Sequence, residues 1–249
     1  MRLASRHAIL TGGSGGIGRE IAKGLVKEGA KVTILDVVAP NEDLGAPDAL
    51  RAVGCDLRSS EDINRGVANA AAAFGPADIL IHAAAHQPAY PFEQIPFEGW
   101  RKTFEVNVDS FYHLVRAVLP GMKARGWGRI LSFTSITFNE GTPEHADYTA
   151  SKAALIGASR VLAKEFGKFG ITVNTLSAGL TKTAVAVRAV EEMVKLGHPN
   201  YFEMYIGQQS LKRNLVPQDH VGPVIFLVSD ESAAISGQTL IVDGGKMHA

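Results

Sequence analysis

The sequence predicts an α/β fold, a doubly wound parallel sheet of the Rossmann-like type. Short, β-branched apolar runs alternate with longer helical stretches, which is the pattern of βαβ units. These runs are apolar at nearly every position, as expected for strands that helices cover on both faces. No Pro/Gly/Ser linker and no repeat divides the 249 residues, so we interpret residues 1–249 as a single domain.

Seven segments carry the strand pattern, and each is short and rich in β-branched side chains. They are His7–Thr11, Lys31–Asp36, Ala52–Cys55, Asp78–His82, Arg129–Thr134, Ile171–Ser177 and Thr239–Val242. Right-handed crossovers between parallel strands would place the intervening helices on both faces of the sheet.

Five segments between the strands carry a helical pattern: Gly16–Glu28, Ser60–Phe74, Phe97–Arg125, Tyr148–Phe169 and Pro217–Ser229. The connection from Asp36 to Ala52 is rich in Pro, Gly and acidic residues, which predicts a short or irregular helix there. Residues 183–215 mix apolar and charged side chains without a strand pattern. This segment is predicted to form a small helical flap over a site.

The composition argues against several function classes. Lys+Arg and Asp+Glu are both 25, so no basic excess exists to neutralise nucleic-acid phosphates. No apolar run approaches the roughly 20 residues that span a bilayer, and no signal-peptide pattern precedes Thr11. Cys55 is the single cysteine, and the eight histidines show no paired metal-ligand spacing. We expect a soluble cytoplasmic protein with no metal, no nucleic acid and no membrane among its partners.

A glycine-rich segment, Thr11–Gly18, joins the first strand to the first helix and reads TGGSGGIG. Glycines there permit a tight turn and let backbone N–H groups and the helix N-terminus approach a pyrophosphate closely. Such a segment can also be no more than a strand–helix turn. The dinucleotide interpretation assigns cofactor binding to Gly12, Ser14, Gly16, Ile17 and Gly18.

An acidic residue, Asp36, ends the second strand 18 residues after Gly18. The expected offset of a ribose-binding carboxylate is about 20 residues. A carboxylate accepts hydrogen bonds from ribose hydroxyls and repels a 2′-phosphate, and the two residues that follow are uncharged valines. The pattern favours NAD over NADP. Asp56 and Leu57, after the third strand, are candidate adenine contacts, although Asp56 could instead cap the next helix.

Tyr148 and Lys152 lie four residues apart on a predicted helix, so both project from one face. A tyrosine with its ordinary pKa of about 10 is a poor base at neutral pH, and a nearby ammonium group lowers that pKa. Ser135 ends the fifth strand, at the carboxyl edge where open α/β sheets bind ligands. Its hydroxyl can donate to a substrate oxygen. The three residues indicate acid/base chemistry on a carbonyl or an alcohol.

Together these motifs resemble those of the short-chain dehydrogenases/reductases. The resemblance rests on TGGSGGIG, on Asn107 within FEVNV, on Ser135, on YTASK at 148–152 and on GQTLIVDGG at 237–245. They follow the family order over essentially the whole chain. The resemblance implies an NAD-dependent oxidoreductase that moves a hydride between nicotinamide and a secondary alcohol/ketone pair.

The resemblance also implies a role for each matching residue. Tyr148 would exchange the proton with substrate, and Ser135 would orient the carbonyl. Lys152 would bind the nicotinamide ribose and lower the pKa of Tyr148, and Asn107 would hold a water that links Lys152 to solvent. Tyr148 and Lys152 thus also count as cofactor contacts, together with Ala83, Ala84, Thr181 and Thr183. A homotetramer is the assembly that the resemblance implies.

Two segments depart from the family pattern. His82–Ala85 (HAAA) stands where the family usually has Asn-Asn-Ala-Gly, so His82 must replace the bonding that an asparagine provides in the central sheet. Ala178-Gly179 stands where the family usually has Pro-Gly, which is expected to soften the hinge of the flap.

Within the family, residues 91–134 are similar to bacterial 1-phenylethanol dehydrogenases, and residues 137–143 to pyridoxal 4-dehydrogenases. The candidate substrate contacts have an apolar and aromatic bias, which favours a hydrophobic or aryl small-molecule substrate. They are Ser135, Thr137, Phe138, His145 and Tyr148, followed by His86, Gln87, Tyr90, Val185, Met193, Tyr201 and Met204.

Three alternatives stay open. An NADPH-dependent 3-oxoacyl-thioester reductase would use the same chemistry. A non-catalytic dinucleotide-sensing protein would keep the fold but would not need an acid/base group. The segment GGSGG also satisfies the G-x-S-x-G elbow of hydrolases, with Ser14 as nucleophile, but no earlier strand exists to supply the oxyanion loop.

Overall fold

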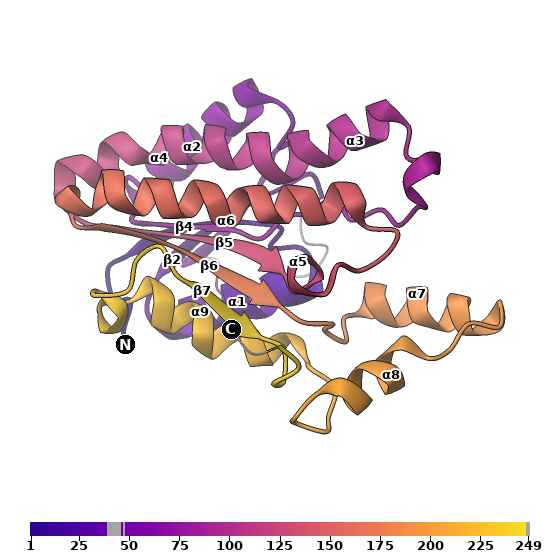
Figure 1. Ribbon diagram of the computed structural model, residues 1–249. Helices are drawn as coiled ribbons and strands as arrows, with labels where there is room; N and C mark the ends of the chain where they lie inside the picture. Colours follow the sequence, from indigo (N-terminus) through magenta and orange to yellow (C-terminus); the bar gives the residue numbers. More distant parts are fainter. Residues whose placement is uncertain (39–45, 47, 248–249) are drawn as a thin grey trace.

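The structure is a computed structural model that describes residues 1–38, 46 and 48–247. A seven-stranded parallel sheet forms its centre, in the order β3-β2-β1-β4-β5-β6-β7 (Figure 1). The strands are β1 His7–Thr11, β2 Lys31–Asp36, β3 Leu50–Gly54, β4 Ile79–His82, β5 Gly128–Ser135, β6 Ile171–Ala178 and β7 Thr239–Val242. This arrangement confirms the predicted doubly wound, Rossmann-like class.

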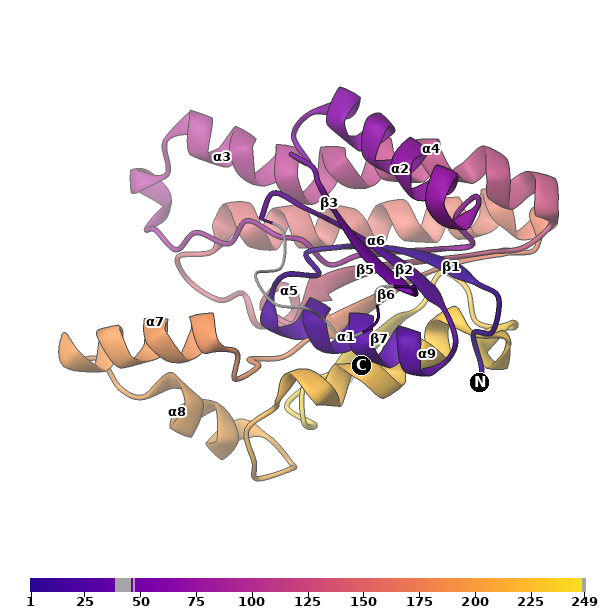
Figure 2. The ribbon, with the colours of Figure 1, turned by 180° about the vertical axis from the view of Figure 1, so that it is seen from behind.

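Helices cover both faces of the sheet (Figures 1 and 2). One face carries α2 Ser60–Phe74, α4 Ser110–Arg125 and α6 Ala146–Phe166, and the other carries α1 Gly16–Lys27 and α9 Val221–Val228. Successive strand residues point to opposite faces, so Leu80 packs in the core under α2, α4 and α6, while Ile79 and Ile81 pack in the core under α1 and α9. Two apolar cores explain why the strands lack hydrophobic alternation.

The helix predicted over Phe97–Arg125 is wrong in one respect, because it is not a single α-helix. It consists of α3 Phe97–Phe104, a π-helical turn at Glu105–Asp109, and α4. Inside the turn the Ser110 hydroxyl donates to the Val106 carbonyl at 2.6 Å, a backward bond that bends helices. π-Helical turns occur frequently at functional sites.

Other predicted boundaries shift by a few residues, as helix and strand ends commonly do. Helix α6 begins at Ala146 rather than Tyr148 and is followed by a 3₁₀ turn, Gly167–Phe169. The helix predicted over Pro217–Ser229 divides into a 3₁₀ turn, Pro217–His220, and α9. Short turns not predicted are Phe92–Gln94, α5 Thr137–Glu140 and Asp230–Ser232. The irregular connection predicted between Asp36 and Ala52 lies largely outside the described residues, which omit 39–45 and 47.

The predicted flap is helical, with α7 Ala184–Lys195 and α8 Tyr201–Gln208. Both helices project from the edge of the sheet at which the strands end (Figures 1 and 2). Strand order reverses between the neighbours β1 and β4, so the loops after these two strands run to opposite sides. Open α/β sheets bind ligands in the crevice at such a point.

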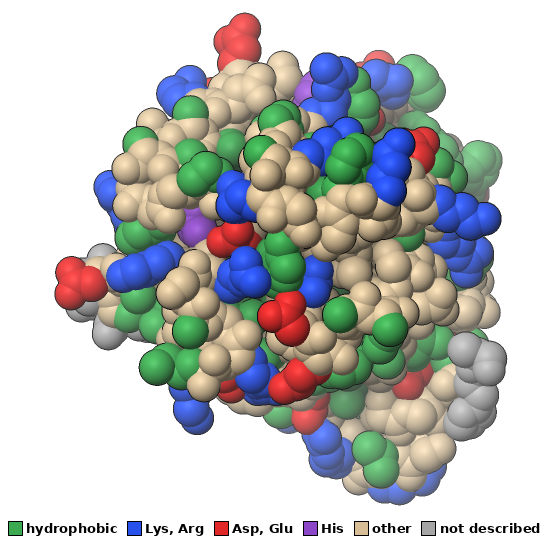
Figure 3. Space-filling model, turned by 90° about the vertical axis from the view of Figure 1, so that its left-hand side faces the viewer, with side chains coloured by type: hydrophobic (Ala, Val, Ile, Leu, Met, Phe, Trp, Pro, Cys, Tyr) green, Lys and Arg blue, Asp and Glu red, His purple; other side chains and the backbone are tan. Residues whose placement is uncertain are grey.

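The opposite end of the molecule, where the strands begin, has a mixed surface. Figure 3 shows basic and acidic side chains interspersed there with apolar ones. Within the described ranges, each helix falls short of the length and hydrophobicity that a membrane span requires.

Candidate active site

Three of the predicted catalytic side chains meet at the carboxyl edge of the sheet. Ser135 ends β5, and Tyr148 and Lys152 lie on α6, which packs along β5 and β6. The Tyr148 hydroxyl is hydrogen-bonded to Ser135, and the Lys152 ammonium lies 5.6 Å from the centre of the Tyr148 ring. Lys152 also donates to the Phe133 carbonyl at 2.8 Å, and this bond holds its ammonium group against β5.

Burial controls the protonation of this group. It raises the pKa of Tyr148 to about 12, against the smaller opposing effect of the Ser135 hydrogen bond. It lowers the pKa of Lys152 to about 7, because a buried ammonium loses its hydration. The predicted lowering of the Tyr148 pKa depends on the positive charge of an oxidised nicotinamide as well as on Lys152, and it stays a prediction. At neutral pH the phenol keeps its proton and is ready to donate it.

The buried ammonium makes folding depend on pH. Between about pH 7 and pH 10.5 the unfolded chain binds a proton at Lys152 that the folded protein does not, so stability rises with pH through this range. Lys152→Met is expected to raise the unfolding midpoint most below pH 7, where the charge is buried, and least near pH 10. Thermal unfolding across this range measures it. Lys164→Met, which removes an exposed lysine from the same helix, is the control. An equal stabilisation at all pH values would contradict the assignment.

Asn107 is buried in the π-helical turn and joins three segments. Its amide accepts from the His86 N–H at 2.7 Å and donates to the His86 carbonyl at 3.0 Å and to the Ser151 hydroxyl at 2.9 Å. Ser151 in turn donates to the Tyr148 carbonyl at 2.6 Å. The structure thus brings Asn107 to the catalytic helix through Ser151, and the predicted water link to Lys152 stays a prediction.

The glycine segment fits closely against the end of β4. Gly12 has a φ of +71°, and a Cβ built there would lie 2.7 Å from the Ala84 nitrogen. The Thr11 hydroxyl oxygen accepts from the N–H groups of Ala83 and Ala84, at 3.1 and 3.2 Å. The predicted cofactor contacts after β1 and β4 therefore lie side by side at the point where the strand order reverses, and the absence of a side chain at Gly12 permits this close packing.

This fit predicts different effects for two glycines of the segment. Gly12→Ala is expected to lower the unfolding midpoint and weaken dinucleotide binding, because a positive φ and a backbone contact together cost about 1–3 kcal/mol. Gly15 has a φ of −78°, and its added Cβ meets only the Gly12 carbonyl, at 3.4 Å. Gly15→Ala should leave the midpoint nearly unchanged. Equal losses in thermal unfolding would contradict the prediction.

Asp36 lies beside the glycine segment at the end of β2. Its carboxylate accepts from the Ser14 N–H at 3.1 Å and, more weakly, from the Val38 N–H at 3.4 Å. The Ser14 hydroxyl donates to the Val38 carbonyl at 2.6 Å. These bonds hold a negative charge next to the segment, where it can meet a ribose.

The side chains of the two predicted adenine contacts are engaged in contacts within the protein. The Asp56 carboxylate is paired with Arg58 at 2.6 Å, and this guanidinium lowers the pKa of Asp56. Leu57 belongs to the hydrophobic core. Their contact with adenine stays a prediction.

The fold and the site match those of known proteins. A family model described as enoyl-(acyl carrier protein) reductase matches residues 12–247. The chain belongs to the short-chain dehydrogenases/reductases. This family membership confirms the resemblance seen in the sequence and makes the protein an oxidoreductase of the alcohol/ketone type with a dinucleotide-binding fold.

Relatives of this dehydrogenase/reductase carry several different names. A protein of Rhizobium meliloti provisionally named galactose dehydrogenase is 32% identical, over 98% of this chain and 95% of its own. An acetoacetyl-CoA reductase of Allochromatium vinosum is 32% identical, over 97% and 98%. A crystal structure from Beutenbergia cavernae is 33% identical with a TM-score of 0.87, over 98% and 97%. That protein is provisionally described as an NAD(P)-dependent gluconate 5-dehydrogenase and holds NADP at low occupancy.

The start of the flap lies against the glycine segment of the enzyme. A Cβ built at Gly16 would lie 3.0 Å from the Thr183 Cβ, and Thr183 caps α7 by accepting from Ala186 at 3.2 Å. The buried Thr181 hydroxyl contacts the Gly179 carbonyl at 3.0 Å and His220 Nε2 at 2.8 Å. Thr183 is thus placed beside the predicted dinucleotide site, whereas the Thr181 side chain is occupied by the protein.

Five of the predicted substrate contacts can be placed in two groups, and contact with substrate stays a prediction for the whole set. Thr137 donates its N–H to the Ser135 hydroxyl at 3.2 Å, and the His145 ring lies 6.2 Å from the Tyr148 ring, so both border the catalytic group. The second group lies on the flap, where Val185, Tyr201 and Met204 are exposed. The flap thus exposes apolar side chains on its surface.

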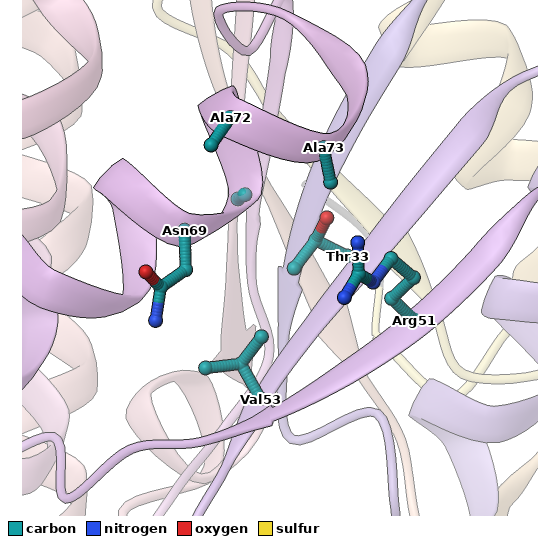
Figure 4. Close-up of a pocket in the computed structure, with 7 residues that line it drawn as sticks. Thr33, Arg51, Val53, Asn69, Ala72 and Ala73 are labelled. Atoms are coloured by element: carbon teal, nitrogen blue, oxygen red, sulfur yellow. The ribbon is translucent and has the colours of Figure 1, made fainter.

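Two grooves lie apart from the catalytic side chains. The first, of about 310 Å³, is bounded by side chains of β3 and α2 (Figure 4), and its lining includes Thr33, Arg51, Val53 and Asn69. The second, of about 360 Å³, lies within the flap between α7 and α8, and its lining includes Lys182, Val187, Val194 and Phe202. Neither contains a predicted catalytic residue.

Sequence reasoning missed several residues that support the site. Thr11 bonds the β4 loop, Ser151 links Asn107 to Tyr148, and Phe133 offers its carbonyl to Lys152. Thr11 had a usable signal, because a polar side chain at the end of a buried strand needs a partner. Nothing local in the sequence marks the Phe133 carbonyl.

Proposed function

We propose that this enzyme interconverts a secondary alcohol, hydrophobic or aryl, and its ketone with NAD as cofactor. The observation that carries the proposal is the contact between Tyr148 and Ser135 beside a buried Lys152. The hydroxyls of Tyr148 and Ser135 lie next to each other at the edge of the sheet where such folds bind ligands. Tyr148 can exchange a proton with a substrate bound there.

In the reducing direction, Tyr148 donates its proton to the carbonyl oxygen of the substrate and Ser135 donates a hydrogen bond to the same oxygen. In the oxidising direction, Tyr148 accepts the alcohol proton, and positive charge nearby favours its phenolate. Lys152 supplies part of that charge. The nicotinamide supplies the hydride-transfer chemistry when it is bound.

Residues of the chain fit such a cofactor. Gly15 and Gly16 are exposed where α1 begins, so a pyrophosphate could approach the backbone there. We assign the adenosine ribose to Asp36, with Asp56 and Leu57 near the adenine, and the nicotinamide half to Tyr148, Lys152, Thr181 and Thr183. The charge of Asp36 and the absence of a basic side chain at positions 37 and 38 support NAD rather than the NADP held by the Beutenbergia cavernae protein.

The substrate assignment follows from the opening of the site. Thr137 and His145 border the catalytic group, Phe138 is exposed on the same short turn as Thr137, and the flap adds exposed apolar side chains. This lining supports a hydrophobic or aryl alcohol, as in the 1-phenylethanol and pyridoxal 4-dehydrogenases. Relatives named for sugars and for an acyl-CoA make a polyhydroxylated substrate or a 3-oxoacyl thioester the main alternative.

Assembly and location belong to the same proposal. Helices α4 and α6 lie side by side on one face of the sheet and expose Tyr112 and Val161, which supports a homotetramer formed through them. We also propose a cytoplasmic location.

A substrate panel tests the function directly. The purified enzyme is incubated with aryl alcohols, hydroxy acids, sugars and 3-hydroxyacyl thioesters, each with NAD and with NADP, and reduced cofactor is followed by absorbance. We expect the highest kcat/KM for an aryl or apolar secondary alcohol with NAD. Preference for a thioester with NADP would replace the proposal by the reductase alternative, and lack of turnover with every substrate would favour a dinucleotide sensor.

A further inference from the structure

We propose that His82 is a positioning residue of the active site, which acts through Ser110 on the π-helical turn that holds Asn107 and so on the alignment of Tyr148. The side chain is fully buried at the end of β4, between Thr11 of β1 and Ser132 of β5 in the strand register. Its ring lies under α4, 5.7 Å from the ring of Phe111.

The hydrogen bonds from His82 have a fixed direction. His82 Nε2 lies 2.8 Å from the Ser110 hydroxyl, which lies 2.6 Å from the Val106 carbonyl. A carbonyl can only accept, so the single hydroxyl proton of Ser110 goes to Val106. His82 must therefore be the donor to Ser110 and carry its proton on Nε2.

The surroundings keep His82 neutral. Burial lowers its pKa to about 3, and the nearby positive charge of Lys152 acts in the same direction. His82 therefore serves as a permanent neutral donor in the interior and does not take part in proton exchange. Its contribution is geometric.

One series of contacts leads from His82 to the catalytic helix. The Val106 carbonyl, bonded by Ser110, directly precedes Asn107 in the π-helical turn. Asn107 then bonds Ser151, and Ser151 bonds the Tyr148 carbonyl. If the turn shifts, the hydrogen bond between Asn107 and Ser151 is strained and Tyr148 moves relative to Ser135, which is attached to the sheet.

Two amide substitutions test the donor position. The amide nitrogen of Gln reaches the place of His Nε2, whereas the shorter Asn places its nitrogen near that of Nδ1. His82→Asn is expected to lower kcat about tenfold, the effect of one misplaced buried hydrogen bond of about 1.4 kcal/mol, with the KM for the dinucleotide within about twofold. His82→Gln should retain kcat within about threefold. Equal kcat values for the two variants, or a kcat of the Asn variant within about twofold of the parent, would overturn the proposal.

A double-mutant cycle with Ser110→Ala separates positioning from general stability. Both substitutions interrupt the same connection, so the double variant should be no slower than the slower single one. Multiplicative losses would mean that His82 acts independently of Ser110, and the proposal fails. Unfolding midpoints are measured in parallel, and rates are taken at least about 10 °C below the lowest of them so that unfolded protein does not lower kcat.

Because these rates presuppose the proposed turnover, one measurement does not need it. Nitrogen NMR of histidine-labelled protein reports which ring nitrogen of His82 carries the proton. We expect the proton on Nε2 in the parent, with an Nε2 resonance that shifts in Ser110→Ala. A proton on Nδ1 would refute the inference even if the enzyme turns over, and the expected tautomer would support it even if no substrate of the panel reacts.

Discussion

Replacing Tyr148 with phenylalanine is expected to lower kcat by about a hundredfold to ten-thousandfold, which is the usual contribution of a positioned acid/base group. The variant loses only the hydroxyl that bonds Ser135, and the ring keeps its packing on α6. Binding of NADH, followed by fluorescence, should therefore change by less than about threefold. Steady-state kinetics on the best substrate of the panel give kcat.

Tyr112→Phe is the matched control for that variant. It removes a phenol hydroxyl from an exposed position on α4, where the hydroxyl bonds Arg116, so kcat should stay at the parent value. Parent-like turnover of Tyr148→Phe would sink the assignment of the acid/base group. Loss of NADH binding in that variant would instead show that the substitution damages the cofactor site.

Combining Asp36→Ala with Val37→Arg is expected to shift the ratio of kcat/KM values for NAD and NADP toward NADP by about a hundredfold. Loss of a charged hydrogen bond to ribose costs about 1.5–3 kcal/mol, and a guanidinium adds a partner for the 2′-phosphate. Val37 is 67% exposed, so an arginine fits there without disturbing the core. Initial rates with both cofactors at several concentrations measure the ratio.

The structure supplies a control for this variant. Because Asp36 also accepts from Ser14, an alanine there removes a support of the glycine segment along with the charge. Asp36→Asn keeps an acceptor oxygen for Ser14 and removes the charge alone. It should raise kcat/KM with NADP while leaving the unfolding midpoint unchanged. An unchanged cofactor ratio in both variants would mean that Asp36 does not touch the ribose.

Most of the fold could be predicted because its signals are local. Each of the seven strands was located, β3 with an offset of two residues, since apolar β-branched runs and their glycine breaks mark strands directly. The π-helical turn could not be predicted. It coincides with side-chain bonds of Asn107 and Ser110 to residues that are distant in the sequence or that lie in the preceding turn.

The candidate site divides in the same way. Tyr148, Lys152 and Ser135 were found from their spacing and their position at a strand end, and the structure brings them together. Their pKa values could not be predicted, since the depth of burial depends on how α6 packs against β5. The histidine at position 82, where the family usually has asparagine, indicated only that another hydrogen bond had to take the place of the asparagine's. The partner in that bond, Ser110, lies 28 residues away in the sequence.

The amino-acid sequence by itself determined the doubly wound fold, the glycine segment with its acidic neighbour Asp36, and the choice of Tyr148 as the candidate acid/base group. Only the tertiary structure decided that burial raises the pKa of Tyr148 and lowers that of Lys152, and that His82 is bonded to Ser110 beside the π-helical turn. Spacing along a chain fixes which side chains share a face of a helix or end a strand. Desolvation and hydrogen-bond partners depend on which segments pack together, and short-range patterns carry little information about that.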